Sequence, residues 1–334
     1  MSFCKFLKQC IPVLALALTL TAPVAAHASE QATEQATEQA AEQAADQIRF
    51  VHVGWTGVTV KTEIATALLD SIGYETSDLL VSVPIAYKAM SMGEADVFLG
   101  NWMPSMASIA QPFFEDGSVL KYVANMPGAQ YTLAVPTYVY EGGLRHFSDI
   151  AEYGDRLDWK IYGIEEGNDG NEIIQMMIDK DMFGLGRFEL VPSSEAGMLG
   201  QVQAAARDEQ WVVFLGWAPH SMNETIDMRY LAGSTAETFG ADDGTATVFT
   251  NVRAGFPEAN PNVATFLKQL TFPVSMMNQI MVELHADDDL KPRDAGLDWV
   301  AQHPDIYNAW LEGVTTADGE PDAPAFEAWL QTRD

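Results

Sequence analysis

One short pattern occurs twice in the sequence. It reads Asp96-Val97-Phe98-Leu99-Gly100-Asn101-Trp102-Met103-Pro104 and, much later, Val212-Val213-Phe214-Leu215-Gly216-Trp217-Ala218-Pro219. Each copy is an apolar run typical of a buried strand, followed by a glycine and then by a tryptophan and a proline. Open α/β sheets bind ligands beyond the carboxyl ends of their strands. Two unrelated buried strands could match by coincidence, but the shared letters favour two similar lobes that face each other across a ligand site.

Strand and helix patterns alternate around these two copies. Short β-rich runs and segments with helical spacing follow one another, and after Phe256 the pattern becomes helical. Such alternation predicts an α/β fold with mainly parallel sheets. The predicted strands are 48–53, 79–83, 96–99, 134–135, 159–164, 189–191 and 211–215. The predicted helices are 59–72, 85–92, 171–180, 196–207, 263–270, 273–284, 290–303 and 305–311.

The charge of the chain limits its partners. Its 334 residues include 47 acidic and 18 basic side chains, which gives a formal charge of −29. Nucleic acids and anionic membrane surfaces require a basic face, so we expect neither as a partner. A small cation or a neutral solute is easier to attract.

The N-terminus resembles an export signal. Lys5 and Lys8 precede an apolar run from Ile11 to Leu20, and Ala26-His27-Ala28 has the small-x-small pattern of a cleavage site. We therefore expect a signal peptide at 1–28 and a periplasmic protein. Both cysteines lie inside this signal, so the mature chain would have no disulfide. Residues 29–47 repeat a Glu-Gln-Ala motif without an apolar stripe, which predicts a solvated acidic leader.

Four aromatic residues stand at predicted strand ends beside glycine or proline. Trp55 follows the first strand, Trp102 and Trp217 follow the repeated strands, and Tyr131 precedes another apolar segment. Core packing is the usual role of a single aromatic residue. Four at such ends could instead surround a quaternary ammonium group, with each ring contributing roughly 0.5–2 kcal/mol of cation–π attraction.

No catalytic or cofactor motif is evident. The sequence contains neither a G-x-S-x-G nor an H-E-x-x-H motif, and its histidines lack metal-ligand spacing. We therefore predict no catalytic residue, no cofactor and no metal. The loop Asp318-Gly319-Glu320-Pro321-Asp322 could hold Ca²⁺ but does not fit the EF-hand spacing. The stretch 165–171 (EEGNDGN) could donate hydrogen bonds to a ligand or simply cap a helix.

From about 48 to 330 the sequence resembles the substrate-binding proteins of ABC importers for choline and glycine betaine, and most closely their choline-binding branch. The matching stretches are 53–56 (VGWT), 96–104, 163–171 (GIEEGNDGN), 214–223 (FLGWAPHSMN) and 310–314 (WLEGV). The resemblance implies a type II periplasmic binding protein, in which two α/β lobes close on the ligand about a hinge. It also implies delivery of the solute to a permease in the inner membrane.

The resemblance also implies ligand-binding residues. The aromatic box of the branch falls on Trp55, Trp102, Tyr131 and Trp217, and a ligand-facing asparagine falls on Asn168. Choline binders of this branch typically have an aspartate two residues after the first tryptophan, where this chain has Gly57. Losing that carboxylate favours zwitterions such as glycine betaine, trimethylamine N-oxide or a dimethylsulfonio compound, although choline could bind through the box alone.

Taken together, we expect a monomeric solute-binding protein for a small methylated ammonium compound. One lobe would comprise 48–135 plus 248–334 and the other 136–247, with crossings near 135–138 and 245–251. The alternative is a secreted α/β hydrolase that acts on a choline ester or a related amine. A receptor-coupled sensor with the same pocket is a third hypothesis.

Overall fold

The computed structural model describes residues 47–321 and 323–332. The predicted signal peptide and all of the predicted leader except Gln47 lie outside these residues, as does Asp322 of the suggested calcium loop. The described residues from Gln47 onward belong to one compact unit. Within the described residues, no helix is long and apolar enough to cross a membrane.

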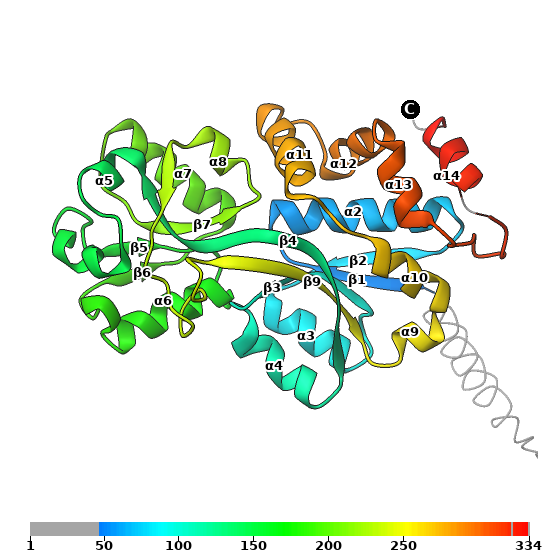
Figure 1. Cartoon of the computed structure of the whole chain (residues 1–334), viewed down its shortest axis with the longest axis horizontal. Coiled ribbons are helices and arrows are strands. Elements are labelled where there is room, and N and C mark those ends of the chain that lie inside the picture. The colour runs from blue at the N-terminus through cyan, green and yellow to red at the C-terminus, as the bar shows by residue number, and fades with distance from the viewer. Residues whose placement is uncertain (1–46, 322, 333–334) are drawn as a thin grey trace, which may run out of the picture. The chain divides into compact units, whose positions relative to one another are not determined.

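A single mixed sheet runs through this unit in the order β2-β1-β3-β9-β4-β7-β5-β6, and β8 pairs with β4 as well. Its strands are β1 (Ile48–His52), β2 (Thr76–Leu80), β3 (Val97–Met103), β4 (Val119–Pro136), β5 (Lys160–Tyr162), β6 (Glu189–Val191), β7 (Phe214–Ala218), β8 (Met228–Tyr230) and β9 (Thr245–Arg253). Helices cover both faces of the sheet (Figure 1).

The sheet contains two groups of parallel strands, which we call the β1 half and the β7 half. In the β1 half, β1 pairs in parallel with β2 and β3. In the β7 half, β5 pairs in parallel with β6 and β7. The predicted α/β fold is therefore confirmed, but the expectation of mainly parallel sheets is wrong, because β4 and β9 join the two halves through antiparallel pairs.

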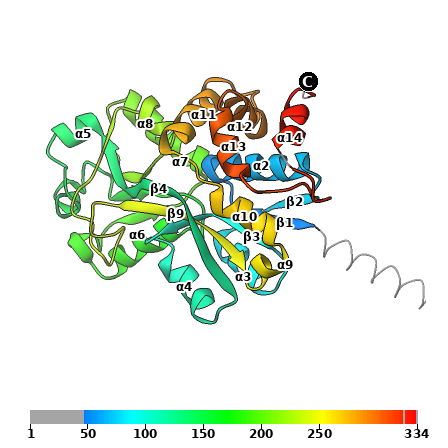
Figure 2. The same ribbon diagram turned by 45° about the vertical axis from the view of Figure 1, so that its right-hand side comes forward.

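Helices pack on each half of the sheet (Figures 1 and 2). Around the β1 half these are α2 (Thr56–Ser71), α3 (Val83–Ser91), α4 (Ala107–Glu115), α9 (Phe256–Ala259), α10 (Pro261–Gln269), α11 (Val274–Ala286), α12 (Pro292–Ala301), α13 (Pro304–Leu311) and α14 (Ala323–Leu330). Around the β7 half they are α5 (Thr137–Glu141), α6 (Asp169–Asp179), α7 (Glu195–Arg207) and α8 (Met222–Thr225), with the short 3₁₀ turns η1 (Phe147–Tyr153) and η2 (Met182–Gly184).

The long strand β4 belongs to both halves. Residues Val119 to Gln130 of β4 pair with β9, whereas Gln130 to Ala134 pair with β7 and Ala134 to Pro136 with β8. The change of partner at Gln130, opposite Thr245, is where the chain passes from one half to the other. The predicted crossing at 245–251 lies on β9, and the predicted crossing at 135–138 begins at the end of β4. The exact lobe boundaries stay a prediction.

One sequence-based expectation was wrong in detail, and some elements were not predicted. The repeated strands continue through their tryptophans, so Trp102 and Trp217 lie inside the last residues of β3 and β7 rather than beyond them. Of β4 only 134–135 was predicted as a strand, and Pro127 and Gly128 lie at a register shift between β4 and β9. Helix α4, which contains Pro112, was not predicted either.

Candidate functional site

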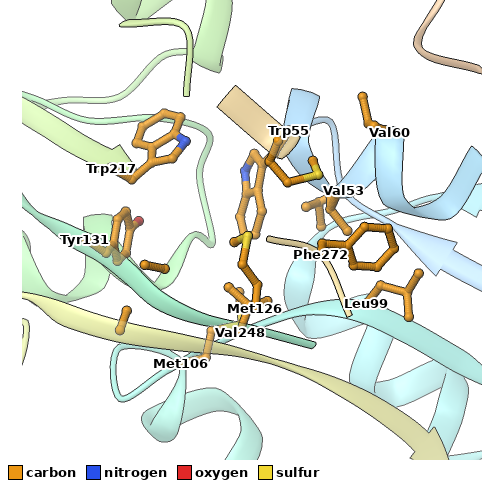
Figure 3. Packing of buried hydrophobic residues seen from close by; sticks show 14 of the residues in the cluster. Val53, Trp55, Val60, Leu99, Met106, Met126, Tyr131, Trp217, Val248 and Phe272 are labelled. Atoms are coloured by element: carbon orange, nitrogen blue, oxygen red, sulfur yellow. The ribbon is translucent and has the colours of Figure 1, made fainter. Parts of the chain in front are cut away.

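The four predicted aromatic residues surround one pocket. Together with its open mouth, the pocket contains about 490 Å³ that protein atoms do not fill. Figure 3 shows the ring of Trp55 facing the rings of Trp217 and Tyr131 across this space. The residues that line it are Trp55, Gly57, Val58, Lys61, Trp102, Met126, Tyr131, Ile164, Asp169, Trp217, Pro219 and Met277.

Strand pairing places three of the aromatic rings. Tyr131 on β4 lies directly opposite Trp217 on β7, so both side chains leave the sheet on the same face. Their ring centroids are 6.3 Å apart, with an angle of 70° between the ring planes. The Trp102 ring on β3 lies 5.7 Å from the Tyr131 ring. Val248 on β9 pairs with Trp102 on one side and with Met126 on the other, so Trp102 and Met126 lie one strand apart across β9.

Trp55 reaches the pocket from the start of α2. It is the N-cap residue of that helix, just after β1, and only 8% of its surface is exposed. Its indole Nε1–H donates a hydrogen bond of 2.7 Å to Glu165 Oε1, in the loop between β5 and α6. Burial raises the pKa of the Glu165 carboxyl. This bond fixes the indole plane and connects the β1 half to the β7 half.

Asn168 lies behind the aromatic wall and does not line the pocket. It is the N-cap of α6, and its Oδ1 accepts hydrogen bonds from the Gly170 and Asn171 amides. The Tyr131 hydroxyl donates to the same oxygen at 3.0 Å. A Cβ atom at Gly170 would collide with that hydroxyl, so glycine is required there. In this structure Asn168 therefore orients Tyr131, and its direct contact with a ligand stays a prediction.

Gly57 does line the pocket. It is the second residue of α2, and its φ is not among the positive values found elsewhere in the chain. A Cβ atom built there would approach only the Met281 sulfur, at an ordinary 3.8 Å. The backbone conformation at this position therefore does not require glycine. The missing side chain is instead a feature of the pocket.

One carboxyl group in the pocket wall was not predicted from the sequence. Asp169, the first residue of α6, is 1% exposed. Burial is the main cause that raises its pKa to about 7; the nearby Glu165 carboxylate adds to this, while the Ser105 side chain opposes it. Among the described residues, no hydrogen-bond partner reaches its Oδ2 atom. The sequence pattern of residues 165–171 suggests hydrogen-bond donors, whereas the side chain of this stretch that lines the pocket is the acid Asp169.

A buried lysine was missed as well. Lys61 is 2% exposed, and its Nζ donates to the Leu99 carbonyl at 2.8 Å and to Asn125 Oδ1 at 3.2 Å. Burial lowers its pKa to about 7. Helical spacing could have revealed it, because Lys61 is one turn after Gly57 and one turn before the buried Ile64.

A second buried group joins the two halves beside the pocket. Glu195, at the start of α7, accepts hydrogen bonds from the backbone and hydroxyl of Thr56. His220 Nε2 lies 3.1 Å from the same carboxylate, while the Met222 amide donates to His220 Nδ1. With the Trp55–Glu165 bond, this makes two polar connections between the N-terminus of α2 and the β7 half.

The chemistry of the pocket suits a small cation with an apolar surface. Aromatic faces attract methylated ammonium groups, and a buried acid can balance their charge. The described residues contain no group of three or more His, Cys, Asp or Glu side chains that could hold a metal ion.

The sequence of residues 46–302 matches the model of the substrate-binding domain of the ABC-type glycine betaine transport system. The chain belongs to this family. Among its relatives is an uncharacterised protein of Chromohalobacter salexigens, which is 54% identical over 126 residues, or 38% of this chain and 81% of that protein. The glycine betaine/carnitine transport binding protein of Listeria monocytogenes is 27% identical over 183 residues, covering 53% of this chain and 57% of that protein.

Solved structures of family members agree with the fold. An ABC-transporter choline-binding protein in complex with choline is 44% identical, with a TM-score of 0.83 over 86% of this chain and 99% of that one. Lactococcal OpuAC in its closed form with glycine betaine is 21% identical, with a TM-score of 0.71 over 79% of this chain and 99% of that one, which bears on the fold alone. This member of the glycine betaine substrate-binding family thus has the predicted two-lobed, type II binding-protein fold.

Proposed function

We propose that this protein captures a small methylated ammonium compound of the choline, glycine betaine or trimethylamine N-oxide type for an ABC importer. The observation that carries the proposal is the convergence of three tryptophans and a tyrosine on one pocket that also holds a buried acid. These rings come from residues 55, 102, 131 and 217, so the site exists only when the whole chain is folded. The choline complex of the 44% identical protein supports the same ligand class.

The two halves of the sheet correspond to the lobes of the proposed binding protein. Residues 48–135 and 248–334 would form one lobe and 136–247 the other, with β4 and β9 as the connection. Trp55 and Trp102 come from the first lobe, and Trp217 and Asp169 from the second, so the pocket is complete only when the lobes approach each other. Ligand would then favour the closed form by hinge motion.

Binding without catalysis is part of the proposal. The described pocket wall contains no serine, cysteine or histidine. A Ser221–His220–Glu195 group lies near it, but it does not have the geometry of a catalytic triad. Ser221 Oγ is 3.5 Å from His220 Nδ1, and that nitrogen already accepts the Met222 amide hydrogen at 3.0 Å. A base occupied in this way is poorly placed to activate the serine.

The remaining parts of the proposal follow from the family and from the sequence. A soluble, monomeric protein would be exported by the signal at 1–28, bind its ligand in the periplasm and deliver it to a permease of the inner membrane. Cofactors, metals and nucleic acids would have no part in this cycle.

Calorimetric titration of the mature protein against choline, glycine betaine, trimethylamine N-oxide and dimethylsulfoniopropionate tests the function. We expect saturable one-to-one binding of at least one compound, with no change in the ligand. If none of the four binds, the proposed ligand class is wrong. Turnover of a choline ester at a rate above buffer would instead support the hydrolase.

A further inference from the structure

Three carboxyl side chains are buried among the described residues, and only one of these three lacks a full set of partners. Asp96 is held by Arg49 at 2.9 Å and by Arg253. Glu195 is held by His220 and Thr56. Asp169, in contrast, has no cationic side chain within ion-pair distance among the described residues, and its Oδ2 has no hydrogen-bond partner. A buried carboxylate that is ionised without a partner destabilises a protein, so such an atom requires an explanation.

The position of this carboxyl group supplies the explanation. Asp169 lines the aromatic pocket, while its Oδ1 accepts a hydrogen bond of 3.2 Å from Asn168 Nδ2, which holds the side chain in place. It is also the first residue of α6, where the helix dipole creates a positive potential that opposes a bound cation. A carboxylate at this point offsets that positive potential at the place where the ligand would bind.

On the basis of the proposed function, we propose that Asp169 is the charge partner of the bound ammonium group. Its carboxylate gives the pocket a preference for ligands with a net positive charge. The aromatic rings recognise the methyl groups of any such ligand. Asp169 adds an attraction that a zwitterion uses only in part, because the ligand's own anionic group is repelled by the same carboxylate.

Other charged groups surround Asp169, and they do not replace this role. Glu165 and Glu172 raise its pKa, since like charges disfavour its ionised form. The hydroxyls of Tyr87 and Tyr131 feel its charge, and burial raises the pKa of both. Lys61 lines the same pocket but is bonded to Leu99 and Asn125. The Ser105 side chain already favours the ionised carboxylate, and a bound cation would favour it further.

Binding of a permanent cation should therefore release a proton. In the empty pocket the pKa of Asp169 is about 7, so at pH 6 roughly nine-tenths of these groups are protonated. A cation binds the ionised form and lowers this pKa. The affinity for choline should then be about tenfold weaker at pH 6 than at pH 8. A neutral isostere, 3,3-dimethylbutan-1-ol, has the same shape without the charge and should lack this dependence.

The first experiment uses the unaltered protein. Choline is titrated at pH 6.5 in two buffers with different enthalpies of ionisation, and the difference in binding heat gives the number of protons released. We expect more than half a proton for choline and none for the isostere. Equal heats in both buffers, together with the same choline affinity at pH 6 and pH 8, would overturn the proposal.

The second experiment compares Asp169→Asn with Asp179→Asn. Both substitutions make the same chemical change on α6, but Asp179 is exposed at the far end of the helix. At pH 8, Asp169→Asn should weaken choline at least tenfold, weaken glycine betaine less and leave the isostere within about twofold. Asp169→Asn should also abolish most of the proton release. This result distinguishes Asp169 from Lys61, because a bound cation would also favour the neutral form of Lys61 and could release a proton from it. Asp179→Asn should behave like the parent.

The results separate this inference from the function on which it rests. If the parent binds no methylated ammonium compound, the function itself is wrong. If the parent binds choline and a folded Asp169→Asn protein binds it equally well, the function stands and Asp169 is not the charge partner. Thermal melting of the empty variant confirms that it is folded, and we expect a higher melting temperature because an unpartnered buried acid is gone.

Discussion

Replacing Gly57 with aspartate should shift the selectivity of the pocket towards choline. The residue lines the pocket at the start of α2, has no side chain and has room for one, because a new Cβ would meet only Met281 at 3.8 Å. An acid in the first helical turn also interacts favourably with the helix dipole, by about 0.3–1 kcal/mol. We therefore expect Gly57→Asp to fold.

The size of the shift follows from the charges. A carboxylate about 4 Å from an ammonium group, at an effective dielectric constant near 20, attracts it by roughly 4 kcal/mol before desolvation. Asp169 already lies in the same pocket, so the two acids repel each other and the second adds less than the first. A remaining difference of about 1.4 kcal/mol in binding free energy corresponds to a tenfold difference in affinity. We therefore expect the ratio of choline affinity to glycine betaine affinity to rise at least about tenfold.

The assay is calorimetric titration of choline and glycine betaine at pH 8, where Asp169 of the parent is largely ionised. Gly57→Asn is the matched control, since it has the same shape without the charge and should leave the affinity ratio within about twofold of the parent. Thermal melting reports whether both variants are folded. A folded Gly57→Asp protein with the parental ratio would refute the role of this position in selectivity.

Further outcomes are expected from other parts of the molecule. Trp217→Ala should weaken ligand binding by roughly 1–3 kcal/mol in a titration, and a folded variant with parental affinity would contradict the aromatic box. Asp96→Asn should lower the free energy of unfolding in urea by about 3–5 kcal/mol, because Arg49 and Arg253 lose their buried partner, while an unchanged midpoint would exclude this role. The pKa of Lys61 is about 7 in the folded chain and 10.5 ordinarily, so between pH 7 and pH 10.5 the unfolded chain binds more protons at this residue. Lys61 therefore makes the free energy of unfolding rise with pH in this range. Lys61→Met should remove that rise in urea titrations at pH 7 and pH 10, and an identical slope in the variant would count against it. Small-angle scattering should give a smaller radius of gyration with saturating ligand, unless the free protein is already closed.

The overall fold was accessible from the sequence because its signals are local. The repeated VFLG pattern lies on β3 and at the start of β7. Helices α6, α7 and α10 to α13 begin and end within a few residues of their predicted bounds, whereas α8, α9 and α14 were not predicted. The shared strand β4 was not accessible in the same way. Its partner changes at Gln130, and that change depends on pairing with residues far away in the chain, which a local pattern does not encode.

The pocket was predicted unevenly for a similar reason. Aromatic residues beside glycine and proline stand out in a sequence, so Trp55 and Trp217 could be placed in advance. Asp169 could not, because its role depends on burial and on the absence of a partner for one oxygen atom. An acid after an asparagine at a helix start reads as an ordinary first-turn residue. Sequence alone therefore predicted the aromatic part of the pocket and missed its charge.

The aromatic pocket also has an optical consequence. Three of the eight tryptophans in the chain line the pocket. Each of the three lies beside another aromatic ring or an ionisable side chain, and such neighbours affect indole emission. Trp55 donates to a carboxylate, and Trp217 packs 5.1 Å from the His220 ring. A ligand that enters among these rings changes their polarity and their exposure to water. The protein therefore carries its own fluorescent reporter, and its emission spectrum can follow occupancy in real time without any attached dye.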